Sequence, residues 1–326
     1  MRKILLLLAL LSSCGATMPV QTQKPAEAAK TPAPPASKTL DAARLLEDVR
    51  VLSADAMEGR GTGTPGGAMA RAYVTRRFAD AGLKPLGASF EQTFELPERA
   101  GGPKSGVNLV GYVPGRTHPE RFVVVTAHYD HLGVSGGKVF NGADDNASGV
   151  AVLLQLAARF GGARPPENSF IFAALDAEEL GLLGARALVK QLQAEKRALA
   201  LNVNLDMVSR SDRGELYAVG TFQTPALRAP LERVAARAPV KLLFGHDRPE
   251  LGKGDWTNQS DQFHFHRAGV PFVYFGVEDH RDYHQPTDDF AVITTEFFVH
   301  AAETVLDAAE TLDSELDTLK KTGGKG

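Results

Sequence analysis

The sequence predicts an α/β fold, namely a single-domain α/β/α sandwich around a mainly parallel, mixed central sheet. Two observations lead to this prediction. Nearly continuous apolar runs of strand length, such as FVVVTAH at 122–128 and SFIFAALDA at 169–177, alternate with longer stretches of helical spacing. Strands that are apolar on both sides are typical of a parallel sheet covered by helices on both faces. With 326 residues, the chain is long enough to bury such a core.

Each expected element follows from its own pattern. Apolar residues recurring every three or four positions indicate helices at 40–54, 66–81, 148–160 and 180–192. Short apolar runs indicate strands at 106–113, 122–128, 169–177, 200–208 and 270–275. No internal repeat is evident.

The chain begins with the layout of a secretory signal. MRKILLLLALLSSC has two cations, an apolar run from Ile4 to Leu11 that is too short to span a bilayer, and then small residues. Its end resembles a bacterial lipobox, and Cys14 is the only cysteine, so an intramolecular disulfide is impossible. We therefore expect a lipoprotein signal at 1–13 and membrane attachment through lipid on Cys14. The alternative is a plain signal with an incidental cysteine. The expected location is the bacterial cell envelope, at the outer membrane, facing the periplasm or the exterior.

Composition suggests how the rest of the chain is organised. Residues 14–39 are rich in Pro, Ala, Thr and Lys without apolar periodicity, which predicts a flexible tether after the lipidated cysteine. One domain is expected at 40–319, followed by a disordered tail at 320–326. The net charge of −3 and the lack of a basic block argue against a nucleic-acid partner.

Polar groups of the kind that bind metals follow several of the predicted strands. In a parallel sheet, ligands bind beyond the carboxyl ends of the strands, so these groups are expected at one edge. The groups are His128 and Asp130; Asp176, Glu178 and Glu179; Asp206; and Asp282, His284 and Asp288. A further segment, NGADDNASG at 141–149, carries Asp144 and Asp145, and taken alone it would be an ordinary helix start with favourable acidic residues.

The ordered set HYDH, NGADDNASG, DAEELGLLG, NLDMV, SDQFHFHRAGVPFVYF and DYHQPTDD resembles the co-catalytic zinc exopeptidases of the bacterial leucyl aminopeptidase type. Their relatives in peptidase clan MH include glutamate carboxypeptidase and glutaminyl cyclase. The resemblance covers about residues 105–310 and implies the zinc exopeptidase fold and two Zn²⁺ per chain. A zinc pair needs a bridging carboxylate and a few terminal ligands that leave positions open. By motif position, Asp145 resembles the bridge, with His128 and Asp206 at one ion and Glu179 and His284 at the other.

The resemblance also implies catalytic roles. Glu178 resembles the general base of an enzyme that hydrolyses N-terminal residues from peptides through a hydroxide held by two zinc ions. Without the neighbouring motifs, Glu178 would simply be an acid at the start of a helix. Asp130 resembles the carboxylate that orients a metal-bound histidine, here His128, although an exposed loop acid is the alternative. His131 is not expected to be a ligand, because the family pattern places no metal there.

The sequence departs from the family at the expected oxyanion donor. Well-known members have a tyrosine shortly before the SD motif, whereas this chain has GDWTNQSD, so Trp256, Thr257 or Asn258, or the zinc ions alone, would stabilise the oxyanion. His264 and His266 alternate, so one of them could face the cleft. Loops at 208–222 and 244–259 are expected to shape the specificity pocket.

Three other functions stay open on the sequence alone. They are a carboxypeptidase or dipeptidase, a glutaminyl cyclase with a single zinc, and a lipid-anchored binding protein without activity. The preferred side chain, the native metal and the oligomeric state are not indicated.

Overall fold

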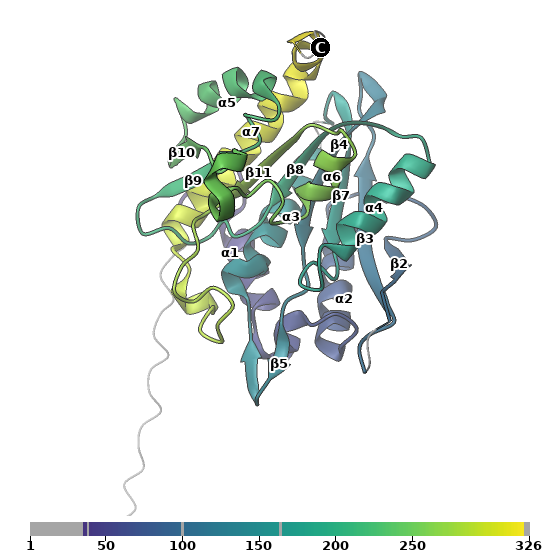
Figure 1. Ribbon diagram of the computed structural model, residues 1–326, viewed down its shortest axis with the longest axis vertical. Coiled ribbons are helices and arrows are strands. Elements are labelled where there is room, and N and C mark those ends of the chain that lie inside the picture. Colours follow the sequence, from purple (N-terminus) through teal and green to yellow (C-terminus); the bar gives the residue numbers. More distant parts are fainter. Residues whose placement is uncertain (1–34, 38, 99–100, 163–164, 323–326) are drawn as a thin grey trace, which may run out of the picture. The chain divides into compact units, whose positions relative to one another are not determined.

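The computed structural model describes residues 35–37, 39–98, 101–162 and 165–322. Its centre is a sheet with the strand order β1-β3-β7-β4-β8-β11-β9-β10, and β2 also pairs with β3 (Figure 1). The strands of this sheet are β1 (Lys84–Pro85), β2 (Glu91–Glu95), β3 (Ser105–Val113), β4 (His118–His128), β7 (Asn168–Leu175), β8 (Ala198–Leu205), β9 (Glu215–Val219), β10 (Lys241–Phe244) and β11 (Phe272–Gly276). A separate hairpin consists of β5 (Gly133–Ser135) and β6 (Lys138–Phe140).

The middle of the sheet is parallel and its flanks are mixed. β4 runs parallel to both of its neighbours, β7 and β8, and β8 runs parallel to β11. β3 is antiparallel to β7, and β11 is antiparallel to β9. The predicted mainly parallel, mixed sheet is therefore confirmed. The expected loop at 208–222 is partly wrong, because β9 forms within it and pairs at the far side of β11.

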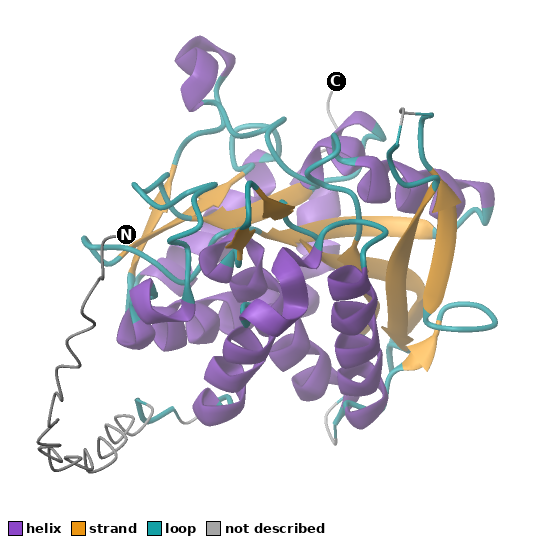
Figure 2. Cartoon of the chain, turned by 90° about the horizontal axis from the view of Figure 1, so that it is seen from below, coloured by secondary structure: helices purple, strands orange, loops and turns teal. Residues whose placement is uncertain are grey.

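Helices cover both faces of this sheet (Figure 2). The helices are α1 (Ala42–Leu52), α2 (Pro65–Asp80), α3 (Gly149–Gly161), α4 (Leu183–Ala194), α5 (Arg228–Ala235), α6 (Gln262–Arg267) and α7 (Thr295–Thr322). Short helical turns occur at η1 (Asp55–Arg60), η2 (Ala143–Ser148), η3 (Pro225–Leu227), η4 (Pro249–Gly254) and η5 (Phe290–Val292).

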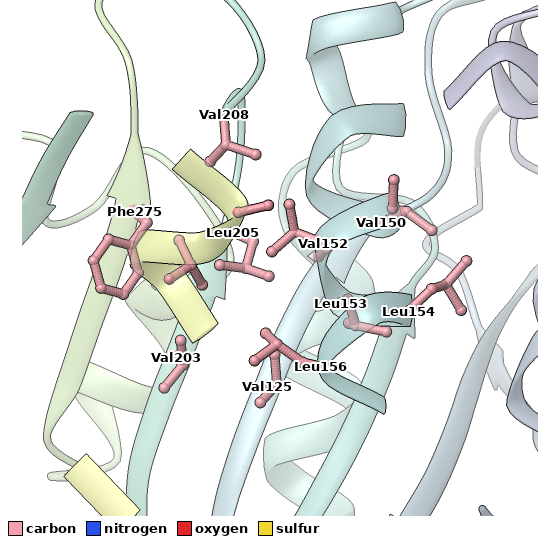
Figure 3. Close-up of a cluster of buried hydrophobic side chains, with 14 of the residues drawn as sticks. Val125, Val150, Val152, Leu153, Leu154, Leu156, Val203, Leu205, Val208 and Phe275 are labelled. Atoms are coloured by element: carbon pink, nitrogen blue, oxygen red, sulfur yellow. The ribbon is translucent and has the colours of Figure 1, made fainter. Parts of the chain in front are cut away.

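The two cores follow from the alternation of side chains along β4. Val123 and Val125 belong to the larger core, whereas Val124 belongs to a second core with Leu188 of α4. Figure 3 shows Val125 beside the apolar side chains of α3, including Val152 and Leu156. α3 is apolar on almost every side, because it lies between the sheet and other helices. Its first residue is therefore held in a fixed place relative to the ends of the strands.

Local signals explain where the first two helices begin. Asp41 caps α1 by accepting the Arg44 amide, and Thr64 caps α2 by accepting the Gly67 amide. Pro65 occupies the first turn of α2, where its missing N–H costs nothing. The predicted helices at 40–54 and 66–81 thus begin and end within two residues of the observed ones.

The ends of the expected domain differ in detail from the structure. α7 continues to Thr322, so the segment 320–322 is helical rather than part of a disordered tail. Ser37, placed in the expected tether, donates a 2.6 Å hydrogen bond to Glu303 of α7. The expected signal at 1–13 and the tether as far as residue 34, with Cys14, lie outside the described residues. Among the residues that are described, no helix is both long and apolar enough to cross a membrane.

Candidate metal centre

The strands deliver the candidate residues to one edge of the sheet. His128 is the last residue of β4, Glu178 and Glu179 follow β7, and Asp206 follows β8 directly. His284 lies on the loop after β11. These four strands are neighbours and parallel, so their carboxyl ends meet at the same edge. The sheet therefore brings together residues that are up to 156 positions apart in the sequence.

Two groups of ligand atoms share Asp145. In the first group, His128 Nε2 lies 3.3 Å from Asp145 Oδ1 and 3.2 Å from Asp206 Oδ1. In the second group, His284 Nε2 lies 3.1 Å from Asp145 Oδ2 and 3.5 Å from Glu179 Oε2. Asp145 thus presents one carboxylate oxygen to each histidine. That is the arrangement a bridging ligand requires.

The structure adds His131 to the second group. His131 is fully buried, and its Nδ1 lies 2.7 Å from Glu179 Oε1 and 3.8 Å from Asp145 Oδ2. The family pattern gave no reason to expect it there. The signal was present as the second histidine of HYDH, but no periodicity fixes the direction of a side chain beyond the end of a strand.

The turn that carries Asp145 is held from two sides. Asp288 accepts the backbone amides of Asp144 and Asp145 at 3.0–3.2 Å. On the other side, the Arg60 guanidinium donates to the carbonyls of Asn141 and Gly142. The Asp145–Asn146 peptide is cis. The Asp145 carboxylate is therefore placed by backbone hydrogen bonds and not by its own side-chain contacts alone.

Asp130 is placed differently from the expectation. His128 Nδ1 lies 3.1 Å from the backbone carbonyl of Asp130, whereas the nearest carboxylate oxygen is 3.9 Å away. The Asp130 carboxylate instead accepts the amides of Glu178 at 3.0 Å and Glu179 at 3.3 Å. Asp130 therefore orients His128 through its main chain. Its side chain fixes the backbone that carries the two glutamates.

The carboxylates and histidines at this edge shift one another's pKa values strongly. Burial would raise the pKa of Asp145, but His131, His128 and His284 lower it well below its ordinary value. Asp145 and Glu179 raise the pKa of His284 to about 10. Burial would lower the pKa of His128, but Asp206 and Glu178 raise it well above the usual range. The buried carboxylates at this edge are thus accompanied by positive charge, which a bound cation would also supply.

The donor set fits a zinc-type ion. Imidazole nitrogen and carboxylate oxygen are the ligands that zinc takes in catalytic sites. The oxygen Oε1 of Glu179 and both ring nitrogens of His131 are buried without an aligned hydrogen bond to the residues that the structure describes. Buried polar atoms rarely stay unpartnered, so these atoms point to a missing ligand. The residues present therefore fit a metal.

A family model described as peptidase family M28 matches residues 108–309, a segment that contains all of these ligand residues. The chain belongs to peptidase family M28.

Two curated relatives of this M28 chain illustrate its similarity. Aminopeptidase YwaD of Bacillus subtilis is 34% identical over 201 residues, which cover 58% of this chain and 41% of the relative. The alkaline phosphatase isozyme conversion protein of Escherichia coli is 31% identical over 194 residues, which cover 55% of each chain. The chain spans about half the length of the curated relatives it matches.

Solved structures share the M28 fold at lower sequence identity. BSAP, a zinc aminopeptidase from Bacillus subtilis, superposes with a TM-score of 0.68 at 19% identity, covering 83% of this chain and 94% of that one. A glutaminyl cyclase from Fimbriiglobus ruber gives a TM-score of 0.65 at 20% identity, covering 86% and 99%. Both kinds of enzyme therefore share the α/β architecture predicted from the sequence.

A cavity of about 290 Å³ opens onto the ligand residues of this M28 chain. Beside His128, Asp145, Glu178, Glu179, Asp206 and His284, it is lined by Gly181, Leu182, Met207, Asn258, Gln259 and Tyr283. The expected loop 244–259 contributes its last two residues, but the described residues of 208–222 line no part of this cavity. The walls thus come mainly from the ends of β7 and β8 and from the loops that precede α6 and follow β11.

The expected oxyanion donors occupy different environments. Trp256 stacks on His246 with ring centroids 3.7 Å apart, and Thr257 is buried and accepts from Gln223. Only Asn258 of the three lines the cavity. Tyr283, which the sequence did not single out, also lines it and stacks on His284 at 4.0 Å.

The SD motif and two histidines that follow it complete the surroundings. Ser260 accepts a 2.9 Å hydrogen bond from Asn204 of β8. Asp261 is fully buried, and neither of its carboxylate oxygens has a hydrogen-bond partner among the described residues. His264 and His266 lie on α6, and neither lines the cavity.

Glu178 has the environment of a base. Burial raises its pKa well above the ordinary value, and the nearby Asp261, Asp206 and Glu179 raise it further against the lowering effect of His128. A carboxylate whose pKa is raised toward neutrality exchanges protons more effectively near the pH at which the enzyme works.

Proposed function

We propose that this chain is a two-zinc aminopeptidase that removes N-terminal residues from peptides. The proposal depends mainly on Asp145, whose two carboxylate oxygens lie 3.3 Å from His128 Nε2 and 3.1 Å from His284 Nε2. One carboxylate shared between two histidines supports a pair of ions and not a single one. The relatives named as aminopeptidases support the same reaction class.

The proposed ligand set divides between the two ions. His128 and Asp206 would hold one ion, Glu179 and His284 would hold the other, and Asp145 would be shared between them. When bound, two zinc ions polarise the scissile carbonyl and lower the pKa of a water molecule placed between them. His128, Glu179, Asp206 and His284 come from the ends of four neighbouring strands. Asp145 comes from the turn that Asp288 and Arg60 hold through backbone hydrogen bonds.

Glu178 is the proposed general base and then the general acid. It lines the cavity without serving as a ligand, and its amide is fixed by Asp130 at 3.0 Å. In this role its carboxylate takes a proton from the attacking water and passes it to the nitrogen of the leaving amine. Asn258 and Tyr283 line the same cavity and are the proposed hydrogen-bond donors to the oxyanion.

The cavity limits the substrate. Its volume of about 290 Å³ and its apolar residues Leu182 and Met207 fit one side chain of moderate size better than a folded protein surface. We propose short peptides with an apolar N-terminal residue as substrates. We further propose that the protein is held at the bacterial outer membrane by lipid on Cys14, a feature that lies outside the described residues.

The test uses the full chain in detergent with a panel of aminoacyl-p-nitroanilides. Release that a chelator abolishes and added zinc restores would support the proposal, and Glu178→Gln should keep the metal but lose at least about 1,000-fold in kcat. Wild-type turnover in Glu178→Gln would overturn the base assignment. One zinc per chain together with cyclisation of N-terminal glutamine would identify a cyclase instead.

A further inference from the structure

We propose that His131 is an additional ligand in the metal centre and completes the ion position of Asp145, Glu179 and His284. This inference rests on the proposed two-metal function and goes beyond the ligand set that the motifs imply. It would give one ion two histidines and two carboxylates, and the other ion one histidine and two carboxylates.

The distances around His131 are those of a ligand. Its Nδ1 lies 2.7 Å from Glu179 Oε1 and 3.8 Å from Asp145 Oδ2. His131, Asp145 and Glu179 offer three ligand atoms that all lie within 4.8 Å of one another, as do His128, Asp145 and Asp206. The triad that contains His131 is therefore a potential metal site of the same kind as the triad that contains His128, all of whose members were expected ligands.

The contact between His131 and Glu179 is short but poorly aligned for a hydrogen bond. Nδ1 and Oε1 lie 2.7 Å apart, yet both stay without an aligned partner among the described residues. Two buried atoms in this arrangement keep lone pairs available to a shared cation. A positioning histidine would instead point its N–H along the line to the carboxylate.

The imidazole ring of His131 is fixed in position and shielded from water. His131 is fully buried, so water does not satisfy its nitrogens from the surface. A Cβ on Gly142 would lie 2.5 Å from Cδ2 of His131, and Gly142 has a left-handed φ of 55°. The glycine thus leaves the space that the imidazole occupies beside the bridging turn.

His131 and His284 would contribute differently to binding the metal ion. His284 lies on a loop with its side chain 37% exposed, whereas the side chain of His131 has no exposure. His131 would then be the preformed ligand, and His284 the ligand that closes the site from solvent. Two imidazoles on one ion would also favour zinc over manganese or magnesium.

The experiment compares His131→Leu with the wild-type full chain in detergent, and uses His118→Leu as the matched control. His118 is the first residue of β4, at the end of the strand far from His131, and it contacts none of the proposed ligands. Zinc content and zinc dissociation constants are measured by competition with a chromophoric chelator. The thermal midpoint without metal checks that each variant is folded. The proposal predicts that His131→Leu raises the dissociation constant of one ion at least about 100-fold, while His118→Leu leaves both unchanged.

A direct observation separates a ligand from a positioning residue. Ring-nitrogen NMR of histidine-labelled protein should reveal three zinc-bound histidines in the wild type and two in His131→Leu. The same spectrum of His131→Gln, which keeps a polar side chain, should also lack one zinc-bound ring.

Failures of the two proposals give different results. Two tightly bound zinc ions and peptidase activity with only two zinc-bound histidines would overturn the role of His131 and leave the proposed function intact. Fewer than two zinc ions in the wild type would contradict the two-metal function itself, and this inference with it.

Discussion

The backbone amide of Glu178 donates a 3.0 Å hydrogen bond to the Asp130 carboxylate, and the next amide, that of Glu179, donates to its other oxygen at 3.3 Å. The proposed base and a proposed ligand are therefore fixed through their main chains by one buried acid. Asp130, two positions after His128, thus links the end of β4 to the loop after β7.

Removal of this acid should affect catalysis more than folding. Asp130→Ala frees both amides, so we expect kcat/KM to fall about 100-fold and zinc affinity to fall by about 10-fold to 100-fold. Thr62→Val is the control, because it removes a hydroxyl that donates to Asp130 at 3.3 Å and leaves the carboxylate in place. Steady-state kinetics and zinc titration measure both effects. Wild-type kcat/KM in Asp130→Ala would contradict the positioning role.

Arg60 should be essential for the bridging turn. Its buried guanidinium donates to the carbonyls of Leu52, Tyr129, Asn141 and Gly142 at 2.6–2.9 Å. Burial lowers its pKa only to about 10, so it is charged at neutral pH. Arg60→Met leaves several buried carbonyls without donors, each at a cost of about 1–3 kcal/mol.

We therefore expect Arg60→Met to lower the free energy of unfolding of the metal-free protein by at least about 3 kcal/mol, as measured by urea denaturation. Arg50→Met is the matched control. Arg50 pairs with Glu47 at the surface, so its loss should change stability by less than about 1 kcal/mol. Equal effects of the two substitutions would show that the buried hydrogen bonds of Arg60 are not important.

A buried ion pair holds α1 against α2. Asp48 accepts two hydrogen bonds from Arg77, at 2.8 and 2.9 Å, and one from the Tyr73 hydroxyl at 2.6 Å. Asp48→Ala would leave the guanidinium buried without its partner, so we expect a loss of about 3–5 kcal/mol. Because this contact lies away from the metal residues, folded Asp48→Ala should keep the wild-type KM. A loss below about 1 kcal/mol in a denaturant titration would be incompatible with this account.

The sequence predicted the parts of the fold that have continuous apolar patterns. β4, β7 and β8 are buried on both faces in their central parts, and α3 and α4 carry clear apolar stripes, so their positions follow from periodicity. β9 is short and only partly buried, and its pairing depends on β11, more than 50 residues later. No local sequence pattern indicates that β11 will be the partner of β9.

The lack of local patterns for long-range contacts also explains which features of the site were not predicted. Motif order, together with the resemblance to the zinc exopeptidases, was enough to propose Asp145, Glu179 and His284. It could not give the orientation of His131 or the main-chain contact from Asp130, because both depend on loop conformations. The role of Arg60 depends on four carbonyls from separate segments, which come together only in the folded chain.

The acid limb of the pH profile should depend on Asp261. Burial, with smaller contributions that include Asp261, raises the pKa of Glu178 well above the ordinary value, and Glu178 must be ionised to act as a base. Activity is therefore present above this pKa and is lost as the pH falls through it. Burial raises the pKa of Asp261 itself to about 7, so this carboxyl is only partly ionised along the acid limb. Asp261→Asn removes that negative charge, which makes ionisation of Glu178 easier and lowers its pKa.

We expect the acid midpoint of kcat/KM to move to lower pH by about half a unit or more in Asp261→Asn. The plateau at higher pH should change by no more than a few fold, since the amide keeps the shape of the side chain. Asp212→Asn, which changes an exposed acid in a different cavity, should leave the midpoint where it is. A midpoint that stays in place would mean that Asp261 carries no charge along the acid limb. A midpoint that rises would mean that the acid limb reports a group other than Glu178, because the loss of a nearby negative charge can only lower the pKa of a carboxyl.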